Sequence, residues 1–349
     1  MRAYGRRKVL ALAVGLLAGA VACSGTPSGA PTPQAAGVTR DPVSASPTPS
    51  PSPTAPPITP EEAREVFTAF TAADNVLRVA AARGYSTLKP EGDLTRDGQK
   101  ELTAAAFTAS GDRPPQRVWG EPELLVPRFL PEEKAPWFSV LVPRDGRPTF
   151  LVFAKSGERW YLGSAAELQR GATMPEVEVD ALGYATLVPS DDKSVLIGPK
   201  LMAPLHATVA EAGKKGVAAD LLADGPYTTE IAARIAADRS EWKRGGYFYN
   251  PIMSASEYPV YALRTKDGGA FVQYTLTRNI TVEPRIGSAV SDGIPVPDAA
   301  RWAIKKDRLF FSLKMSEIHQ YATSIPPASS KSRAVVIAHD GGMIRAFGK

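Results

Sequence analysis

Residues 24–58 constrain what this chain can fold into more than any other segment, because they offer almost nothing to a hydrophobic core. Of these 35 residues, 10 are Pro, 6 are Ser and 5 are Thr, and the large apolar residues among them are Val38, Val43 and Ile58. A segment of this composition cannot bury enough apolar surface to offset the entropy lost on folding. We therefore predict a disordered tether that ends at residue 58 and a folded part over residues 59–349.

The same segment predicts how far the folded part can extend from its attachment point. Proline-rich chains favour the extended polyproline II conformation at about 3.1 Å per residue, which gives a reach of up to roughly 100 Å. The Ser-Pro and Thr-Pro repeats at 46–54 are typical of an O-glycosylated stalk, and they also suit a bare spacer. The sequence leaves both interpretations open.

Residues 1–22 have the three zones of an export signal. The first zone carries four basic residues, residues 9–22 form an uncharged run of 14, and small residues close the segment. A membrane-spanning helix needs about 20 apolar residues, so this run is too short for a stable span. Arg6 and Arg7 also loosely match a twin-arginine signal. The general secretory route is favoured, and the sequence does not decide between the two.

The end of this leader, Ala20-Val21-Ala22-Cys23, resembles a bacterial lipobox, in which small residues precede a cysteine that is lipidated and becomes the new N-terminus. The resemblance implies cleavage between Ala22 and Cys23, lipid attachment at Cys23 and a tether over residues 23–58. Two or more acyl chains anchor a protein stably. We predict a protein held on the extracytoplasmic face of the cell membrane by its lipid anchor. The alternative is an ordinary secretory signal with a chance cysteine.

Charge and cysteine content exclude some classes of partner and stabilisation. The net charge is +5, but without the four basic residues of the leader 37 basic residues face 36 acidic ones. The folded part contains no basic block, so we predict no nucleic-acid partner. Cys23 is the only cysteine, so no disulfide can form within the chain.

The first helix of the folded part is predicted to begin at Thr59-Pro60-Glu61-Glu62. Thr59 can cap the helix, Pro60 suits its first position and Glu62 completes a capping box. Apolar residues then recur at three- and four-residue spacing up to Ala80, which gives the helix one buried face. A shorter helix is predicted over residues 99–108.

From residue 117 the apolar period changes from that of a helix to that of a strand. The runs 138–142 and 149–153 flank Arg144-Asp145-Gly146-Arg147, and this turn chemistry predicts a hairpin. Further strands are predicted over 118–129 and 159–163.

The order of elements repeats in the second half of the chain. Helices are predicted over 199–212 and 229–243, and the segment Tyr261–Gly268 (YALRTKDG) parallels Ser139–Gly146 (SVLVPRDG) at an offset of 122 residues. A second hairpin is thus predicted around residues 266–269. The remaining predicted strands are 258–263, 270–276, 309–323, and a terminal hairpin of 334–338 and 343–347 around Asp340-Gly341-Gly342.

Helices followed by meandering antiparallel strands favour an α+β fold over a parallel α/β sheet. The repeat and the length of the folded part predict two domains in tandem. Their predicted bounds are 59–172 and 199–349, and residues 173–198 form the connecting segment.

Helix pairs followed by a curved antiparallel sheet resemble the nuclear-transport-factor-2-like fold, which is cystatin-like and cone-shaped. The chain is similar to a group of actinobacterial lipoproteins of unknown function that share a lipobox, a Pro/Ser/Thr stalk and two such domains in tandem. The family brings no catalytic residues to carry over, and a fold alone does not define a function. The residues that carry the resemblance are 59–70, 124–128, 150–153, 160–161 and 199–210.

The sequence contains no familiar catalytic or metal-binding motif. His206, His319 and His339 are not at metal-ligand spacing, and no HExxH, GxSxG or glycine-rich phosphate loop occurs. SxxK occurs at 86–89, 190–193 and 240–243, but the SxN partner motif of penicillin-binding enzymes does not. We predict no catalytic residue, no metal site and no cofactor.

Cone-shaped folds often enclose an apolar pocket with a few polar groups, which gives two hypotheses of function. The first is a non-catalytic binding or assembly module whose partner is an envelope protein, a wall polymer or a small ligand. The second is a small-molecule enzyme that uses the pocket of one domain. The alternative for the aromatic candidates is that they are ordinary core or rim residues. The candidate lining residues are Asp74, Tyr85, Trp160 and Tyr161 in the first domain, and His206, Tyr247, Tyr249 and Tyr274 in the second.

Overall fold

The structure is a computed structural model that describes residues 56–83, 90–129, 134–285 and 292–349. Residues Pro53–Lys349 form one compact unit. Its α-helices are α1 (Pro60–Ala82), α2 (Pro90–Asp93), α3 (Asp97–Ala109), α4 (Pro199–Ala212) and α5 (Thr229–Arg244), with short 3-10 helices η1 (Gly213–Lys215) and η2 (Asp298–Ala300). Its strands are β1 (Glu123–Leu125), β2 (Trp137–Arg144), β3 (Arg147–Ser156), β4 (Arg159–Leu168), β5 (Tyr247–Ala255), β6 (Tyr261–Arg264), β7 (Ala270–Pro284), β8 (Ile294–Pro295), β9 (Arg308–Leu309), β10 (Leu313–Ile325) and β11 (Val335–Gly348).

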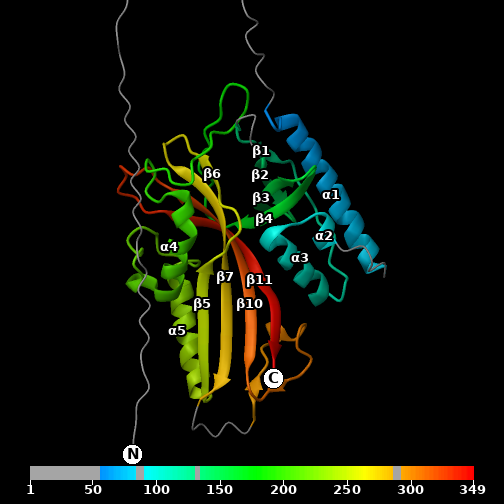
Figure 1. Cartoon of the computed structure of the whole chain (residues 1–349), viewed down its shortest axis with the longest axis vertical. Helices are drawn as coiled ribbons and strands as arrows, with labels where there is room; N and C mark the ends of the chain where they lie inside the picture. Colours follow the sequence, from blue (N-terminus) through cyan, green and yellow to red (C-terminus); the bar gives the residue numbers. More distant parts are fainter. Residues whose placement is uncertain (1–55, 84–89, 130–133, 286–291) are drawn as a thin grey trace, which may run out of the picture. The chain divides into compact units, whose positions relative to one another are not determined.

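Nine of these strands form one sheet in the order β1-β2-β3-β4-β11-β10-β7-β5, and β6 pairs with β7 beside this path. Every strand pair in it is antiparallel. In Figure 1 the long strands β5, β7, β10 and β11 run together, and β2–β4 lie across their upper end. The predicted α+β class is therefore confirmed.

The strands of both predicted domains belong to this one sheet. The seam between them is the pairing of β4 with β11, through Ala338 opposite Leu168 and His339 opposite Glu167. The structure does not confirm two cone-shaped domains in tandem. The division into 59–172, 173–198 and 199–349 stays a prediction.

The start of α1 is confirmed in detail. The Thr59 hydroxyl accepts a hydrogen bond from the Glu62 backbone N–H at 3.2 Å, and the Glu62 carboxylate accepts one from the Thr59 N–H at 2.8 Å. Together these form a capping box, which satisfies donors that the first helical turn leaves unpaired. Phe67 and Phe70, one turn apart, are buried and meet the ring of Phe153 edge-on.

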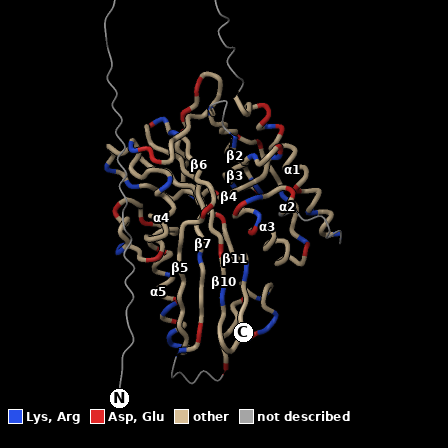
Figure 2. The backbone as a smooth tube through the Cα atoms, viewed as in Figure 1, with Lys and Arg blue, Asp and Glu red and all other residues tan. Residues whose placement is uncertain are grey.

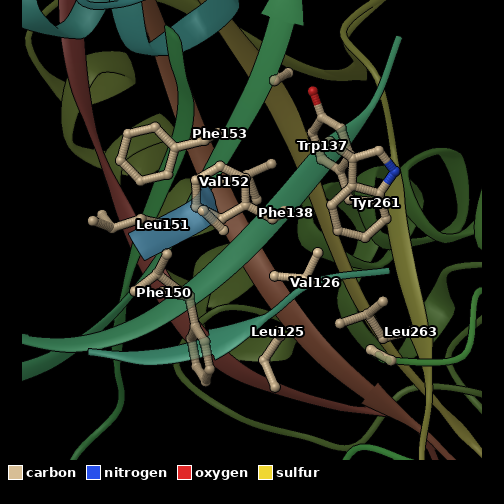
Figure 3. Packing of buried hydrophobic residues seen from close by; sticks show 14 of the residues in the cluster. Leu125, Val126, Trp137, Phe138, Phe150, Leu151, Val152, Phe153, Tyr261 and Leu263 are labelled. Atoms are coloured by element: carbon tan, nitrogen blue, oxygen red, sulfur yellow. The ribbon is translucent and has the colours of Figure 1, made fainter. Parts of the chain in front are cut away.

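Three apolar cores hold the sheet in place. The first lies around β2 and β3, where Phe138 and Phe153 stack with ring centroids 5.0 Å apart (Figure 3). The second lies between α4, α5 and the sheet. The third lies around the start of β5, the end of β7 and the start of β10. Fully burying one large apolar side chain contributes about 1.5–3 kcal/mol.

The predicted terminal hairpin is wrong. Asp340-Gly341-Gly342 has local turn chemistry, but these residues continue one long strand, β11, opposite β10. A Cβ added to Gly341 would lie 2.5 Å from the Ile318 carbonyl oxygen, so this glycine permits a close approach of two strands.

Among the described residues, no helix is both long and apolar enough to cross a membrane.

Candidate functional site

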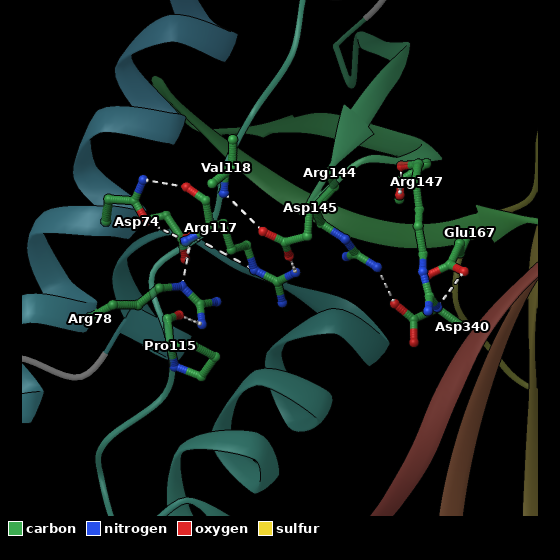
Figure 4. Close-up of polar contacts among 12 residues, drawn as sticks. Asp74, Arg78, Pro115, Arg117, Val118, Arg144, Asp145, Arg147, Glu167 and Asp340 are labelled. Carbon is green, nitrogen blue, oxygen red and sulfur yellow. Dashed lines mark hydrogen bonds and ion pairs between the residues drawn. The ribbon is translucent and has the colours of Figure 1, made fainter.

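A cavity of about 260 Å³ lies where α3, the end of β2 and the middle of β11 come together. We call it the arginine cavity, because Arg78, Arg117 and Arg144 reach its wall from three separate segments. Figure 4 shows their side chains in one row between α1 and β11. Three guanidinium groups around one small space give it a strong concentration of hydrogen-bond donors.

Arg78 is held in place by α1. Its Nε donates to Asp74 Oδ2 at 2.8 Å one helical turn earlier, and its Nη1 donates to the Pro115 carbonyl oxygen at 3.2 Å. Both side chains of this ion pair are less than 10% exposed. A buried pair of this kind fixes geometry, because each charge depends on the other for the solvation that water no longer provides.

The guanidinium of Arg117 is paired less closely with carboxylates than that of Arg78. Its backbone is fixed by two hydrogen bonds with the Asn75 side chain, at 2.8 and 2.9 Å. Its guanidinium, in contrast, is 3.9 Å from Asp74 and 3.8 Å from the half-exposed Asp145. Burial, followed by the positive charges of Arg144 and Arg78, lowers the pKa of Arg117 to about 10. A cation with such surroundings gains from an added negative charge.

Arg144 connects the cavity to the second half of the chain. Its Nη2 donates to Asp340 Oδ2 at 2.7 Å, which joins the end of β2 to β11. Arg144 is buried, whereas the Asp340 side chain is 40% exposed. The cavity is therefore assembled only when both halves of the sheet are in place.

The opposite wall of the cavity is mostly apolar, and Gln99 and Thr103 are its polar side chains. The amide nitrogen of Gln99 donates to the Thr103 hydroxyl at 3.1 Å. Its oxygen is buried and, within the part of the chain that the structure describes, has no hydrogen-bond partner. An apolar cavity with a few convergent polar groups is the usual form of a small-molecule site. The apolar lining residues are Leu102, Ala105, Ala106, Phe107, Ala109, Trp302 and Met343.

A second polar region, the histidine cluster, lies between α4 and the sheet. We define it as the chain's three histidines, His206, His319 and His339, together with Tyr274 and Tyr321. The Tyr321 ring lies 4.6 Å from that of His206 and 4.8 Å from that of His339. Among the described residues, no group of three or more His, Cys, Asp or Glu side chains is placed to hold a metal ion.

The hydrogen bonds of His206 define its protonation. Its Nε2 lies 2.6 Å from the Tyr227 carbonyl oxygen, which can only accept, so Nε2 carries the proton. Burial lowers the pKa of His206 to about 4, so its Nδ1 is unprotonated at neutral pH and accepts from the Tyr274 hydroxyl at 2.8 Å. Tyr274 in turn pairs with the Thr323 hydroxyl at 2.9 Å. Both ring nitrogens of His206 are thus satisfied.

The other two histidines lead to an ion pair at the edge of the cluster. His319 donates from Nε2 to Glu317 at 2.9 Å and pairs through Nδ1 with His339 at 3.0 Å. Two guanidinium nitrogens of Arg278 also donate to Glu317, at 2.6 and 2.9 Å. Burial by itself raises the pKa of Glu317, but the hydrogen bonds from His319 and Arg278 outweigh it and lower the pKa to about 2.

The structure places the predicted lining residues in several locations. Asp74 is buried beside the arginine cavity, and His206 and Tyr274 are hydrogen-bonded in the histidine cluster. Tyr247 and Tyr249 pack against Trp242, at 5.5 and 6.2 Å between ring centroids, in the third core. Tyr85 lies outside the described residues.

Trp160 and Tyr161 are separate from Asp74. Trp160 packs edge-on against Phe138 at the margin of the first core, and the Tyr161 ring lies under the guanidinium of Arg159. The three described first-domain candidates, Asp74, Trp160 and Tyr161, therefore do not come together around one pocket. Sequence reasoning missed Arg78, Arg117 and Arg144 as site residues.

The chain belongs to the family described as a domain of unknown function, DUF8094, whose model matches residues 54–348. Two uncharacterized lipoproteins of Streptomyces coelicolor are similar to it. One is 25% identical over 317 residues, which is 84% of this chain and 85% of the relative. The other is 25% identical over 287 residues, which is 79% of this chain and 82% of the relative.

An uncharacterized lipoprotein of Streptomyces avermitilis is 26% identical over 131 residues, which is 37% of this chain and 38% of the relative. No solved structure matches the chain at a significant level. The resemblance to actinobacterial lipoproteins of unknown function is confirmed by these relatives, whereas the tandem cone-shaped domains are not.

Proposed function

We propose that this chain is a lipid-anchored binding module of the cell envelope that holds an anionic group of its ligand in the arginine cavity. The observation that carries the binding proposal is the Arg117 guanidinium, which borders the cavity and, within the described part of the chain, lies 3.9 and 3.8 Å from its carboxylate partners. Guanidinium groups bind carboxylate and phosphate through paired N–H donors, so an anion between Arg117 and Arg144 would gain charge-assisted hydrogen bonds.

The anchor part of the proposal is supported by the leader and by the relatives. The segment before Cys23 resembles a lipobox, and the similar Streptomyces proteins are named lipoproteins. An acylated Cys23 would hold the folded unit at the outer face of the membrane through the tether. Metabolic labelling with an alkyne fatty acid tests this directly. Labelling of the unchanged chain and not of Cys23→Ala is expected, and equal labelling of both would contradict the anchor.

The shape of the cavity suggests the form of the ligand. A volume of about 260 Å³ is slightly below the usual range for drug-sized ligands, so it suits a small molecule or the end group of a polymer. The arginines lie on one wall and Phe107, Trp302 and Met343 line other parts. We therefore expect an anionic head joined to a short apolar or ring-shaped body.

Thermal unfolding of the full chain with matched ligands tests the binding site. Benzoate and phenylphosphonate carry an anionic head on an aromatic ring, and benzamide is a neutral counterpart of benzoate. We expect the two anions to raise the melting temperature and benzamide to leave it unchanged, because a ligand stabilises only the state that binds it. The shift should disappear in Arg117→Gln.

Arg147→Gln is the matched control for that experiment. Arg147 follows the same β2–β3 turn, but its side chain is 71% exposed and pairs with Glu167 away from the cavity. This variant should keep the full ligand-induced shift. A shift that survives in Arg117→Gln, or one that benzamide also produces, would contradict the anion site.

The alternative of a small-molecule enzyme has one candidate group in the same cavity. Asp340 is the carboxylate among its described lining residues, and its bond to Arg144 keeps it engaged. A general base needs an unshared lone pair within reach of its substrate. Turnover of a bound ligand that Asp340→Asn abolishes, while ligand affinity is retained, would establish the enzyme and replace the binding module.

A further inference from the structure

The end of the sheet next to the C-terminus exposes two adjacent phenylalanines. Phe310 and Phe311 are 63% and 75% exposed, although Leu309 before them and Leu313 after them are buried in the third core. Their backbone N–H groups both donate to the Lys349 carbonyl oxygen, at 2.9 and 2.7 Å. The two rings are thus held outward by a fixed backbone.

Basic residues surround this pair. Lys305, Lys306 and Arg308 precede it, Lys314 follows it, and all four are exposed. The acidic residue among them, Asp307, is engaged by Arg301. Figure 2 shows positively charged segments in the chain near the C-terminus. The surface therefore combines protruding aromatic rings with an excess of positive charge.

A third ring extends the same surface onto the sheet. Phe347 of β11 is 50% exposed and lies opposite Lys314 of β10 in the strand ladder. The guanidinium of Arg345 lies 5.9 Å from the centroid of the Phe347 ring. Large apolar side chains gathered on a surface mark a contact site more strongly than scattered ones do.

We propose that this surface, defined by Phe310, Phe311, Phe347, Lys305, Lys306 and Lys314, rests on an anionic lipid membrane. Aromatic side chains enter the boundary between headgroups and acyl chains, and lysine and arginine are attracted to anionic headgroups. Positive charge around protruding rings fits that occupant better than an apolar protein groove, where the lysines would lose water without gaining partners. The proposal does not require acylation of Cys23.

The contact would orient the folded unit as well as hold it. In Figure 1, α1 begins at the end of the folded unit remote from the C-terminus. The reach of up to roughly 100 Å predicted for the tether is long enough for either end to meet the membrane. The surface that contains Phe310, Phe311 and Phe347 would place the end next to the C-terminus on the membrane.

Depth-dependent quenching in nanodiscs tests this orientation. The full chain is reconstituted into nanodiscs whose lipids are brominated on the acyl chains, and Phe311→Trp adds a fluorescent reporter to the surface. Val335→Trp is the matched control, because Val335 is 45% exposed and begins β11 at the end of the strand remote from Phe347. The emission of the unchanged chain is subtracted from both.

In discs of phosphatidylglycerol we expect the added tryptophan of Phe311→Trp to be quenched at least about twofold more than that of Val335→Trp. The difference should vanish in phosphatidylcholine discs and when Lys305→Glu and Lys306→Glu are added. Equal quenching of the two reporters in anionic discs would overturn the proposal. So would a lipid-free dimer in sedimentation that Phe310→Ser with Phe311→Ser abolishes, because the occupant would then be a second copy.

Discussion

The arginine cavity and the histidine cluster are both polar regions inside the protein, and they meet at adjacent residues of β11. His339 belongs to the cluster, and Asp340 lines the cavity. In the cluster, both ring nitrogens of His206 and the hydroxyl of Tyr274 have partners. In the cavity, the Arg117 guanidinium lies 3.9 Å from Asp74 and 3.8 Å from Asp145. Polar groups with close partners specify packing, whereas a charged group without them remains available to a ligand.

We expect the largest loss in the free energy of unfolding for Asp74→Ala. Asp74 pairs with Arg78, which lines the arginine cavity, but its role is structural. This change removes the hydrogen-bonded partner of Arg78 and leaves a buried cation unpaired, which costs about 3–5 kcal/mol. Urea unfolding measures it. Asp145→Asn is the control, because Asp145 is half-exposed and lies 3.8 Å from Arg117, and the amide keeps an acceptor for the Val118 N–H, so a loss below about 1 kcal/mol is expected. If Asp74→Ala loses no more stability than the Asp145 control, Asp74 is not structural.

The next largest effect is on the pH dependence of stability. Burial lowers the pKa of His206 to about 4 and that of His339 to about 3, from the ordinary histidine value of 6.5. Both are neutral in the folded state, and the unfolded chain binds protons more readily below pH 6.5. The contribution of these two histidines to the free energy of unfolding is therefore complete above pH 6.5 and declines as the pH falls toward 4. The slope is on the order of 1 kcal/mol per pH unit for each group.

Urea unfolding between pH 6.5 and 4.5 isolates the histidines. The contribution of Glu317 is present above the unfolded value of 4.5 and is lost as the pH falls toward about 2, so it lies below this window. His339→Gln should reduce the slope by roughly half if the two groups contribute equally. A slope unchanged by that substitution would mean that His339 is solvated and that the cluster is less closed than the structure indicates.

A smaller effect comes from single hydroxyl groups within the cluster. Tyr274→Phe removes the bond to Nδ1 of buried His206, which should cost about 1–3 kcal/mol. Tyr321→Phe is its matched control, because the buried Tyr321 hydroxyl has no hydrogen-bond partner among the described residues. Its removal should be neutral or slightly stabilising. Calorimetry on both variants measures the difference, and an equal loss would mean that the Tyr321 hydroxyl is also bonded.

The smallest effect on stability is expected for the residue most important to ligand binding. Arg117→Met removes a guanidinium with long ion contacts and relieves its repulsion with Arg78 and Arg144. The free energy of unfolding should change by less than about 1 kcal/mol. A loss comparable to that of Asp74→Ala would make Arg117 a structural residue and remove the contrast between the two regions.

Local chemistry was enough to predict much of the fold. The capping box at Thr59 fixed the start of α1, and the sequence Asp145-Gly146 predicted the turn between β2 and β3, where both residues have positive φ. Each signal depends on residues within a few positions of one another. By contrast, β5 was missed, because Gly245-Gly246 marks the end of a helix without indicating that a strand begins at Tyr247.

Tertiary contacts explain the remaining differences. No local pattern indicates that β4 pairs with β11, and Gly341-Gly342 has turn chemistry although the strand continues through it. In the candidate site, Asp74 and Arg78 are four residues apart in a predicted helix, so their pairing could have been inferred. Arg117 and Arg144 could not, because only the folded sheet brings them to the same cavity.

The position of β11 after both of the strands that it joins has a consequence for biosynthesis. This strand supplies hydrogen-bonding partners to both β4 and β10, and it carries Asp340 to Arg144. Until residues 335–348 have left the ribosome, both neighbouring strands keep an open edge, and such edges attract other chains. The two halves of the sheet and the arginine cavity are therefore joined only once β11 has been synthesised, after both of its neighbouring strands.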